Sequence, residues 1–335
     1  MRIRTIAPVA TLTLGVLLAS AGVAPASAVP AGVHRIGGAD RFAVSAAISA
    51  DTFAAVTSVP VAYVVSGETF PDALSASALA GLKGGPVLLT RRDGLPDAVK
   101  SELSRLRPAK IVVLGGPAAI SAATYDAIGL LAPMTIRLGG ADRFDVSAAA
   151  AREAFPEALP PVSFVASGEN FPDALSGAAA AGHLGGPVLL TRTADLPGVI
   201  HTELTREKAG LVKILGGPNA VSAAVQTAIV TTIQPETARI AGGDRFEGSA
   251  AVSSTLFGAA DTVYIASGES FPDALSGGAA AIVKEAPVLL VNRSSIPEPI
   301  KAELTRLKPT SIVVLGGTSA IAASVEAELK GFLKP

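Results

Sequence analysis

Short, uninterrupted apolar runs alternate along this chain with longer alanine-rich segments. The runs V-A-Y-V-V and I-V-V-L, which begin at Val61 and Ile111, contain no charged residue and are closely followed by glycine. Continuous apolar strands are typical of a parallel sheet that helices cover on both faces. Strands alternating with helices therefore indicate an α/β fold with right-handed crossovers.

The pattern predicts four strand–helix units over residues 33–132. Strands are predicted at Arg35–Ile36, Val61–Ser66, Pro86–Thr90 and Lys110–Leu114. Helices are predicted at Arg41–Phe53, Phe70–Lys83, Pro96–Arg107 and Ala119–Leu131. All four strands are assigned to one module, so the short first strand is expected to lie with the three that follow it.

The same pattern occurs three times. The string S-G-E-x-F-P-D-A-L-S begins at Ser66, Ser167 and Ser267, a spacing of 101 and then 100 residues. Each copy is preceded by R-[IL]-G-G-A-D-R-F, or by R-I-A-G-G-D-R-F in the third, and is followed by P-V-L-L and L-G-G. A period near 100 residues is the size of a small domain. We therefore predict three tandem modules, residues 33–132, 135–234 and 237–334, with no unique region for a separate activity.

The N-terminus predicts export. Arg2 and Arg4 precede an apolar segment at residues 6–19, and Ala26-Ser27-Ala28 is a small-x-small cleavage signal. We read residues 1–28 as a secretory signal peptide cut after Ala28, rather than a membrane anchor. The mature sequence has no second apolar stretch long enough to span a bilayer and no cysteine. We expect a secreted protein held non-covalently at the cell surface or in the cell wall.

Charge and composition narrow the choice of partner. With Arg2 and Arg4 excluded, 25 basic side chains face 28 acidic ones, and no basic run marks a nucleic-acid surface. Tryptophan is absent, and only three tyrosines and eleven phenylalanines occur. A sugar polymer would therefore be recognised mainly through hydrogen bonds and charge.

The repeated polar motifs all follow predicted strands directly. Ligands of α/β sheets bind at the carboxyl ends of the strands, so S-G-E, G-G-x-D-R and L-G-G should share one ligand-facing edge. The candidate ligand-binding residues are Arg41, Ser66, Glu68, Asp72, Arg143, Ser167, Glu169, Asp173, Arg245, Ser267, Glu269 and Asp273.

The acidic candidates each allow more than one interpretation. Asp72, Asp173 and Asp273 follow good N-cap residues (Thr69, Asn170 and Ser270), so they can complete a capping box, contact a ligand, or do both. The glutamates of S-G-E have no capping duty. They can accept hydrogen bonds from sugar hydroxyls, bind a cation, or pair with Arg41, Arg143 or Arg245.

The arginines are placed unusually. Asp40, Asp142 and Asp244 read as N-caps, which puts Arg41, Arg143 and Arg245 in the first turn of a helix. A cation there opposes the helix dipole unless a carboxylate or an anionic ligand offsets it. An internal salt bridge and an anion contact are equally consistent with this position. Arg35, Arg137 and Arg239 precede a short strand and are expected to be structural.

Enzyme chemistry is not favoured. His34, His183 and His201 do not occupy equivalent repeat positions, and no nucleophile triad, metal-ligand spacing or phosphate loop recurs. A carboxylate pair such as Glu68 and Asp72 could act on a glycosidic bond, but three copies of one active site in one chain would be unusual. We expect a non-enzyme with no metal site and no cofactor.

Together the four motifs resemble the type 2 cell wall-binding repeats of Gram-positive surface proteins, over essentially residues 33–333. The resemblance implies three α/β modules with a Toprim-like fold around a pseudo-threefold axis. It also implies non-covalent attachment to an anionic secondary polymer of the wall, such as a teichoic acid-like polysaccharide. The D-x-D pair of Toprim enzymes is missing, so their chemistry is not carried over.

The threefold sequence repeat and the family resemblance both predict multivalent binding. Three weak sites on one frame facing a repeating polymer can raise avidity by roughly 10²–10⁴. Two alternatives remain: a surface or matrix protein that associates with its own copies, and a wall hydrolase that uses a carboxylate pair.

Overall fold

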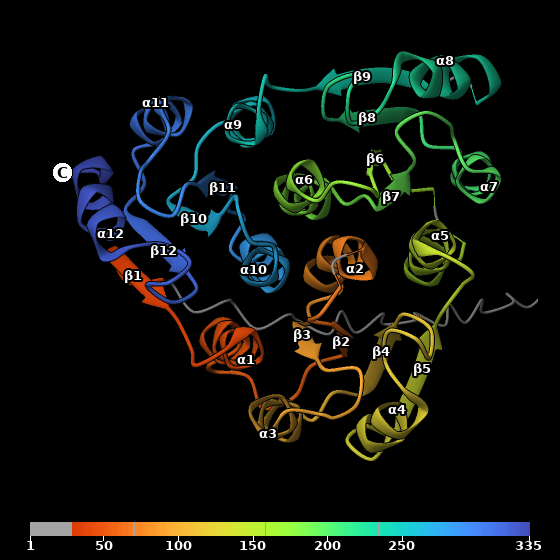
Figure 1. The fold of residues 1–335 in the computed structure, drawn as a ribbon, viewed down its shortest axis with the longest axis horizontal. Helices are drawn as coiled ribbons and strands as arrows, with labels where there is room; N and C mark the ends of the chain where they lie inside the picture. The colour runs from red at the N-terminus through yellow and green to blue at the C-terminus, as the bar shows by residue number, and fades with distance from the viewer. Residues whose placement is uncertain (1–28, 70, 158, 234) are drawn as a thin grey trace, which may run out of the picture.

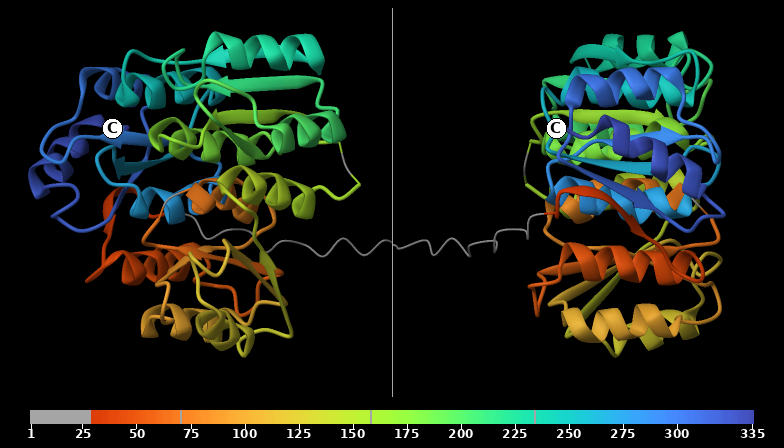
Figure 2. Two further views of the ribbon diagram at one scale, coloured as in Figure 1. Left: turned by 45° about the vertical axis from the view of Figure 1, so that its right-hand side comes forward. Right: turned by 90° about the vertical axis from the view of Figure 1, so that its left-hand side faces the viewer.

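A computed structural model describes residues 29–69, 71–157, 159–233 and 235–335; the predicted signal peptide, residues 1–28, lies outside them. Three four-stranded parallel sheets and their helices surround a common centre (Figure 1). Most helices of the three repeats run along the short axis of the molecule, so that Figure 1 shows them end-on and Figure 2 from the side. The expected α/β fold, three tandem modules in a pseudo-threefold arrangement, is confirmed.

Each repeat contributes four strands and four helices in the predicted order. The first contains β1 (Gly32–Ile36), α1 (Arg41–Thr52), β2 (Val61–Ser66), α2 (Pro71–Leu82), β3 (Val87–Thr90), α3 (Asp97–Leu106), β4 (Lys110–Leu114) and α4 (Ala122–Gly129). The second contains β5 (Met134–Leu138), α5 (Arg143–Ala154), β6 (Ser163–Ser167), α6 (Pro172–His183), β7 (Val188–Thr191), α7 (Gly198–Glu207), β8 (Leu211–Leu215) and α8 (Ala223–Thr232). The third contains β9 (Glu236–Ile240), α9 (Arg245–Leu256), β10 (Thr262–Ser267), α10 (Pro272–Val283), β11 (Val288–Val291), α11 (Glu298–Leu307), β12 (Ser311–Leu315) and α12 (Ala323–Leu329), followed by a 3₁₀ turn at Lys330–Phe332.

The first strand of each repeat lies in the sheet of the preceding repeat. The strand orders are β3-β2-β4-β5, β7-β6-β8-β9 and β11-β10-β12-β1. The prediction that the Arg35–Ile36 strand joins its own module was therefore wrong. An apolar run defines a strand but not its neighbour, and β5 and β9 each lie beside the last strand before them in the sequence.

This arrangement closes the chain into a ring. β1 pairs with β12 from Gly32↔Ser311 to Ile36↔Leu315 (Figure 1, red beside blue). Arg35 Nε lies 2.7 Å from Glu326 Oε2, and Ser311 Oγ donates to the Pro30 carbonyl at 2.7 Å. The two ends of the described chain are thus joined through one sheet.

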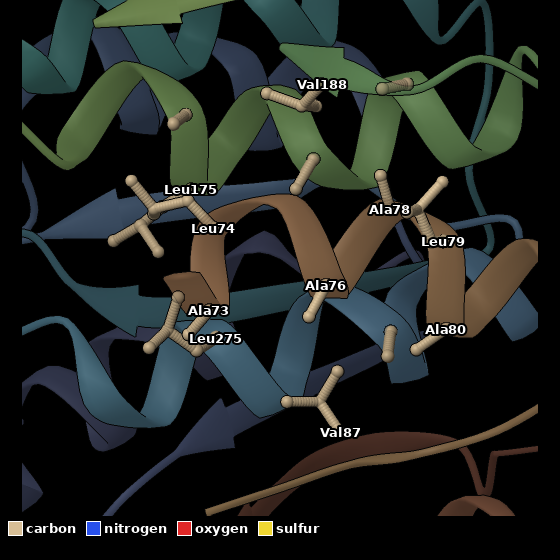
Figure 3. Close-up of a cluster of buried hydrophobic side chains, with 14 of the residues drawn as sticks. Ala73, Leu74, Ala76, Ala78, Leu79, Ala80, Val87, Leu175, Val188 and Leu275 are labelled. Carbon is tan, nitrogen blue, oxygen red and sulfur yellow. The ribbon is translucent and has the colours of Figure 1, made fainter. Parts of the chain in front are cut away.

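Three helices rich in small residues meet at the centre of the ring. α2, α6 and α10 pack against one another, and Ala73, Ala76, Ala78 and Ala80 of α2 are fully buried (Figure 3). The approach is close enough for Ser77 Oγ to donate to the Leu275 carbonyl at 2.7 Å.

One isoleucine fills the space left by two glycines in this centre. Gly81, Gly182 and Ile282 occupy the same repeat position. A Cβ on Gly81 would lie 2.5 Å from Ile282 Cβ, and one on Gly182 would overlap Ile282 Cδ1. The centre therefore has room for only one branched side chain at this level.

We expect Gly182→Ala to lower the free energy of unfolding by about 1–3 kcal/mol, because the added methyl group overpacks against Ile282. Ile282→Ala leaves a cavity and should cost about 2–5 kcal/mol. The double variant should cost less than the sum of the two, with a coupling of about 0.5–3 kcal/mol in urea unfolding.

Gly129→Ala is the matched control, since no atom lies within 4 Å of its added Cβ. It should be neutral or slightly stabilising. Strictly additive effects of Gly182→Ala and Ile282→Ala would contradict the shared-space account.

A buried glutamate distinguishes the second repeat. Glu207 is fully buried and occupies the position of Leu106 and Leu307, while Ser163 takes the position of Ala62 and Val263. Ser163 Oγ donates to Glu207 Oε2 at 2.5 Å, and Oε1 has no partner among the described residues. Burial raises the pKa of Glu207 to about 7.

This pKa predicts a pH-dependent stability. A carboxyl pKa raised from about 4.3 when unfolded to about 7 when folded means that the native state retains a proton that the unfolded chain releases. The free energy of unfolding should therefore fall as pH rises from about 4.3 through about 7, by up to about 4 kcal/mol.

The variant Glu207→Leu with Ser163→Ala copies the first repeat and should lose this component. Urea unfolding of parent and variant at about pH 5 and pH 8 isolates it, because every other titrating group is shared. Equal pH dependence in the two proteins would show that Glu207 does not titrate in this range.

Candidate functional site

Three turns with the same geometry follow strands β2, β6 and β10. The hydroxyls of Ser66, Ser167 and Ser267 are buried. They accept hydrogen bonds from the backbone N–H groups of Glu68, Glu169 and Glu269 at 3.2, 3.2 and 3.1 Å. The buried serines therefore stabilise the backbone of the turn, whereas the glutamate side chains are exposed.

Each of these glutamates holds a second loop in place. A carboxylate oxygen of Glu68, Glu169 and Glu269 accepts from the backbone N–H 24 residues later, at Arg92 (3.2 Å), Thr193 (3.1 Å) and Arg293 (3.4 Å). The hydrogen bonds from Thr193 lower the pKa of Glu169, with the charges of Arg143 and Arg192 adding to the effect. The glutamates thus fix the loop after the edge strand.

The arginines of G-G-x-D-R-F link neighbouring repeats. Nη1 of Arg41, Arg143 and Arg245 donates to the carbonyl of Gly67, Gly168 and Gly268 in the same repeat, at 2.6, 2.5 and 2.5 Å. The Arg41 guanidinium also lies 5.8 Å from the centre of the Phe271 ring. Arg245 lies 5.9 Å from the Phe171 ring. In both cases the aromatic ring belongs to the preceding repeat.

The capping-box interpretation of the aspartates was wrong for the second and third repeats. α6 and α10 begin after Phe171 and Phe271, which make no side-chain cap bond, and proline takes the first helical position. Proline favours that position because its missing N–H has no intrahelical partner there. The helices thus start one residue later than expected, and neither Asn170 nor Ser270 is the cap.

The aspartates pack against the L-G-G turns instead. A Cβ on Gly115 would lie 2.8 Å from Asp72 Oδ2, and Asp173 and Asp273 face Gly216 and Gly316 in the same way. Gly115 has a φ of +111°, a conformation that favours glycine. The first glycine of each L-G-G turn is therefore required by both its backbone and its carboxylate neighbour.

Each aspartate is influenced by an arginine of the next repeat. Burial raises the pKa of Asp72, Asp173 and Asp273, and the charges of Arg143, Arg245 and Arg41, respectively, partly offset this rise. The pairs run from the first repeat to the second, from the second to the third, and from the third back to the first. The candidate sites therefore lie at the three boundaries between repeats.

Two structural roles predicted near these boundaries are confirmed. Asp40, Asp142 and Asp244 are N-caps whose carboxylates accept from the first backbone N–H groups of α1, α5 and α9. Nη1 of Arg35, Arg137 and Arg239 donates to the carbonyls of Gly316, Gly115 and Gly216 at 2.9, 2.8 and 2.6 Å. These arginines hold each exchanged strand to the L-G-G turn of the preceding repeat.

The sequence comparison of the three repeats did not identify two exposed arginines as candidate site residues. Arg91 lies 4.8 Å from the Phe42 ring and 3.4 Å from Asp40 Oδ2. Arg192 lies 4.9 Å from the Phe144 ring and pairs with Asp142. The third repeat has Asn292 at this position, so a search for residues common to all three copies passes over it.

The fold and the boundaries define a class of protein: a ring of three α/β repeats, in which each repeat completes the polar site of its neighbour. The chain belongs to the cell wall binding domain 2 (CWB2) family, whose model matches residues 35–125, 137–226 and 239–326. This confirms the resemblance, identifies the repeats as cell wall-binding repeats and associates the chain with the cell wall.

Known proteins share this region. The chain is 27% identical over 253 residues to N-acetylmuramoyl-L-alanine amidase LytC of Bacillus subtilis, which covers 76% of this chain and 49% of LytC. It is 29% identical over 267 residues to the amidase enhancer of the same organism, covering 77% of this chain and 36% of that protein. The chain thus spans half or less of these curated relatives.

Solved structures show the same fold. Cwp6 from Clostridium difficile superposes with a TM-score of 0.84 at 23% identity, covering 91% of this chain and 48% of Cwp6. Cwp8 from the same organism gives a TM-score of 0.80 at 25% identity, covering 90% of this chain and 52% of Cwp8. Within the described residues, no helix has the length and apolar character needed to cross a membrane.

The cyclic pairing makes a selective prediction. Arg245→Gln should raise the pKa of Asp173, since it removes the charge that opposes the effect of burial. The pKa values of Asp72 and Asp273 should stay unchanged, because their partners are Arg143 and Arg41. Carboxyl ¹³C titration by NMR measures all three in one sample. A shift at Asp273, in the same repeat as Arg245, would contradict pairing across the boundaries.

Proposed function

We propose that this chain is a secreted, non-catalytic protein that binds an anionic secondary polymer of the Gram-positive cell wall and is thereby anchored at the cell surface. The observation that carries this is the arginine at each boundary between repeats. Guanidinium groups bind carboxylate and phosphate oxygens through two parallel N–H bonds.

The geometry at the boundaries supports an anion contact. The hydrogen bonds of Arg41 and Arg245 within the described residues use Nη1, toward Gly67 and Gly268. The other guanidinium N–H groups can then face oxygens of a ligand. The backbone carbonyl and the neighbouring phenylalanine ring fix the direction of each guanidinium, which lowers the entropy lost on binding.

Three such contacts on one closed ring explain how a mildly acidic protein can hold an acidic polymer. After the first boundary engages a chain, the second and third contacts are effectively intramolecular, so avidity can rise by roughly 10²–10⁴ over a single site. The glutamates act here by positioning the loop beside each turn, and the aspartates by setting the local charge.

Co-sedimentation of residues 29–335 with purified cell walls tests the proposal. Half of the walls are treated with hydrofluoric acid, which removes phosphate-linked polymers. We expect binding to intact walls, loss on stripped walls, and weakening as salt rises. Equal binding to both preparations would move the ligand to peptidoglycan. No binding, with association of the protein in light scattering, would favour self-assembly instead.

Arginine variants locate the binding surface. Any one of Arg41→Gln, Arg143→Gln and Arg245→Gln should weaken wall binding about 10-fold or more, and the triple variant should lose the avidity gain altogether. The charge-matched control is Lys100→Gln with Lys330→Gln and Lys334→Gln, all exposed and outside the boundary sites. Equal losses in the two triple variants would indicate a general charge effect without a site.

A further inference from the structure

A hollow lies in the first repeat, and none of the arginine–aspartate pairs of the boundaries lines it. It has a volume of about 480 Å³ and separates the start of α1 from the loop between β3 and α3. Its lining includes Asp40, Ala43, Arg91, Leu95, Pro96 and Asp97. All of these residues belong to one repeat, so the hollow is not completed by a neighbour.

The sequence differences between repeats explain why space is available here. Ala43 occupies the position of Asp145 in the second repeat and Glu247 in the third. Asp145 Oδ2 accepts from the Ala141 backbone N–H at 2.9 Å, and Glu247 Oε2 accepts from Gly243 N–H at 2.7 Å. Those carboxylates lie over the loop whose counterpart in the first repeat, Ala39, lines the hollow.

Several contacts link the walls of the hollow. Arg91 lies 4.8 Å from the Phe42 ring and 3.4 Å from Asp40 Oδ2. Thr90 Oγ1 donates to the Gly94 carbonyl at 3.2 Å within the loop. Glu68, which lies outside this loop, also stabilises it by accepting a hydrogen bond from the backbone N–H of Arg92. These contacts restrain the loop before a ligand arrives, which reduces the ordering required on binding.

The chemistry of the lining distinguishes it from the boundary sites. The charged side chains that line the hollow are one arginine, Arg91, and three aspartates, Asp40, Asp93 and Asp97. Asp93 also pairs with Arg92, which lies outside the lining. The excess of acceptors disfavours a carboxylate or phosphate ligand. Carboxylates accept from hydroxyls and guanidinium N–H groups donate to them, while the half-buried Leu95 and Pro96 offer an apolar wall.

We propose that this hollow binds one neutral, hydroxyl-rich sugar ring, with hydroxyls bridging Asp97 and Arg91 and an apolar ring face against Leu95 and Pro96. The site goes beyond the anion contacts at the boundaries. It would let the first repeat recognise an uncharged unit of a wall glycan, while the other two repeats, with Asp145 and Glu247, lack the space.

Titration of the ¹⁵N-labelled chain, residues 29–335, with individual neutral sugars tests the site. The probes are glucose, galactose, N-acetylglucosamine and N-acetylmannosamine, with glucuronate as the acidic comparison. At least one neutral sugar should shift the amide signals of Ala43, Gly94 and Ala98, with saturation at about millimolar concentration. Raising NaCl to about 1 M, where the Debye length is about 3 Å, should leave this binding unchanged.

Two variants make the test specific. Ala43→Asp introduces the residue that the second repeat already accommodates, so the fold should persist while affinity falls at least 10-fold. Asp97→Ala, at an exposed helix start, should weaken binding several-fold and leave the thermal midpoint within about 2 °C. Arg245→Gln, at a repeat boundary, should leave sugar binding unchanged.

The proposal is overturned if no neutral sugar shifts these amides, if glucuronate binds more tightly than every neutral sugar, or if Ala43→Asp binds as well as the parent. Because the test uses free neutral sugars, its failure is independent of the wall co-sedimentation result. Loss of sugar binding in Ala43→Asp with intact wall binding by all three boundaries would separate the two functions.

Discussion

The exchange of the first strand between repeats is the constraint on which the rest of the structure depends. Because β1, β5 and β9 extend the sheets of other repeats, no repeat has a complete four-stranded sheet alone. The helix that follows each exchanged strand packs against the central helix of the preceding repeat and against the edge strand of its own. The exchanged strand and helix therefore bring the G-G-x-D-R-F loop of one repeat beside the F-P-D and L-G-G motifs of another, and this creates the boundary sites.

Local structure was predictable because each element depends on residues within it. In the first repeat, the apolar runs located the second, third and fourth strands to within one residue, whereas the first strand begins three residues before its predicted start. The N-caps Asp40, Asp142 and Asp244 were found from helix chemistry alone. Partners were not predictable in this way. No local pattern predicts that Arg35 pairs with Glu326, or that the rise that burial causes in the pKa of Asp72 is partly offset by the charge of Arg143 in the next repeat. Both interactions follow from the path of the chain between repeats. The glutamates illustrate the same limit, since each bonds a backbone N–H 24 residues away.

Close similarity between the repeats also conceals their differences. Ile282 can fill the centre only because Gly81 and Gly182 leave space for it. Ser163 and Glu207 form a buried polar pair where the other repeats have two apolar residues. Ala43 lines a hollow in the first repeat, whereas the carboxylates at its position in the other two repeats, Asp145 and Glu247, bond to the backbone of the preceding loop. A threefold pattern therefore describes the backbone, whereas side-chain volume and charge are adjusted one repeat at a time, and a residue present in only one or two copies can still have a function.

Ring closure has a consequence for multivalent binding. Effective concentration is greatest when the spacing between sites matches the ligand and does not fluctuate. An open array of three repeats could bend at two junctions, with an unpaired edge strand at its end that invites association with other chains. Pairing β1 with β12 covers that edge and makes the third junction equivalent to the other two. If the chain binds a polymer as proposed, Arg35, Arg137 and Arg239 contribute to binding by fixing the boundaries, and so the spacing of the arginines that would face the ligand.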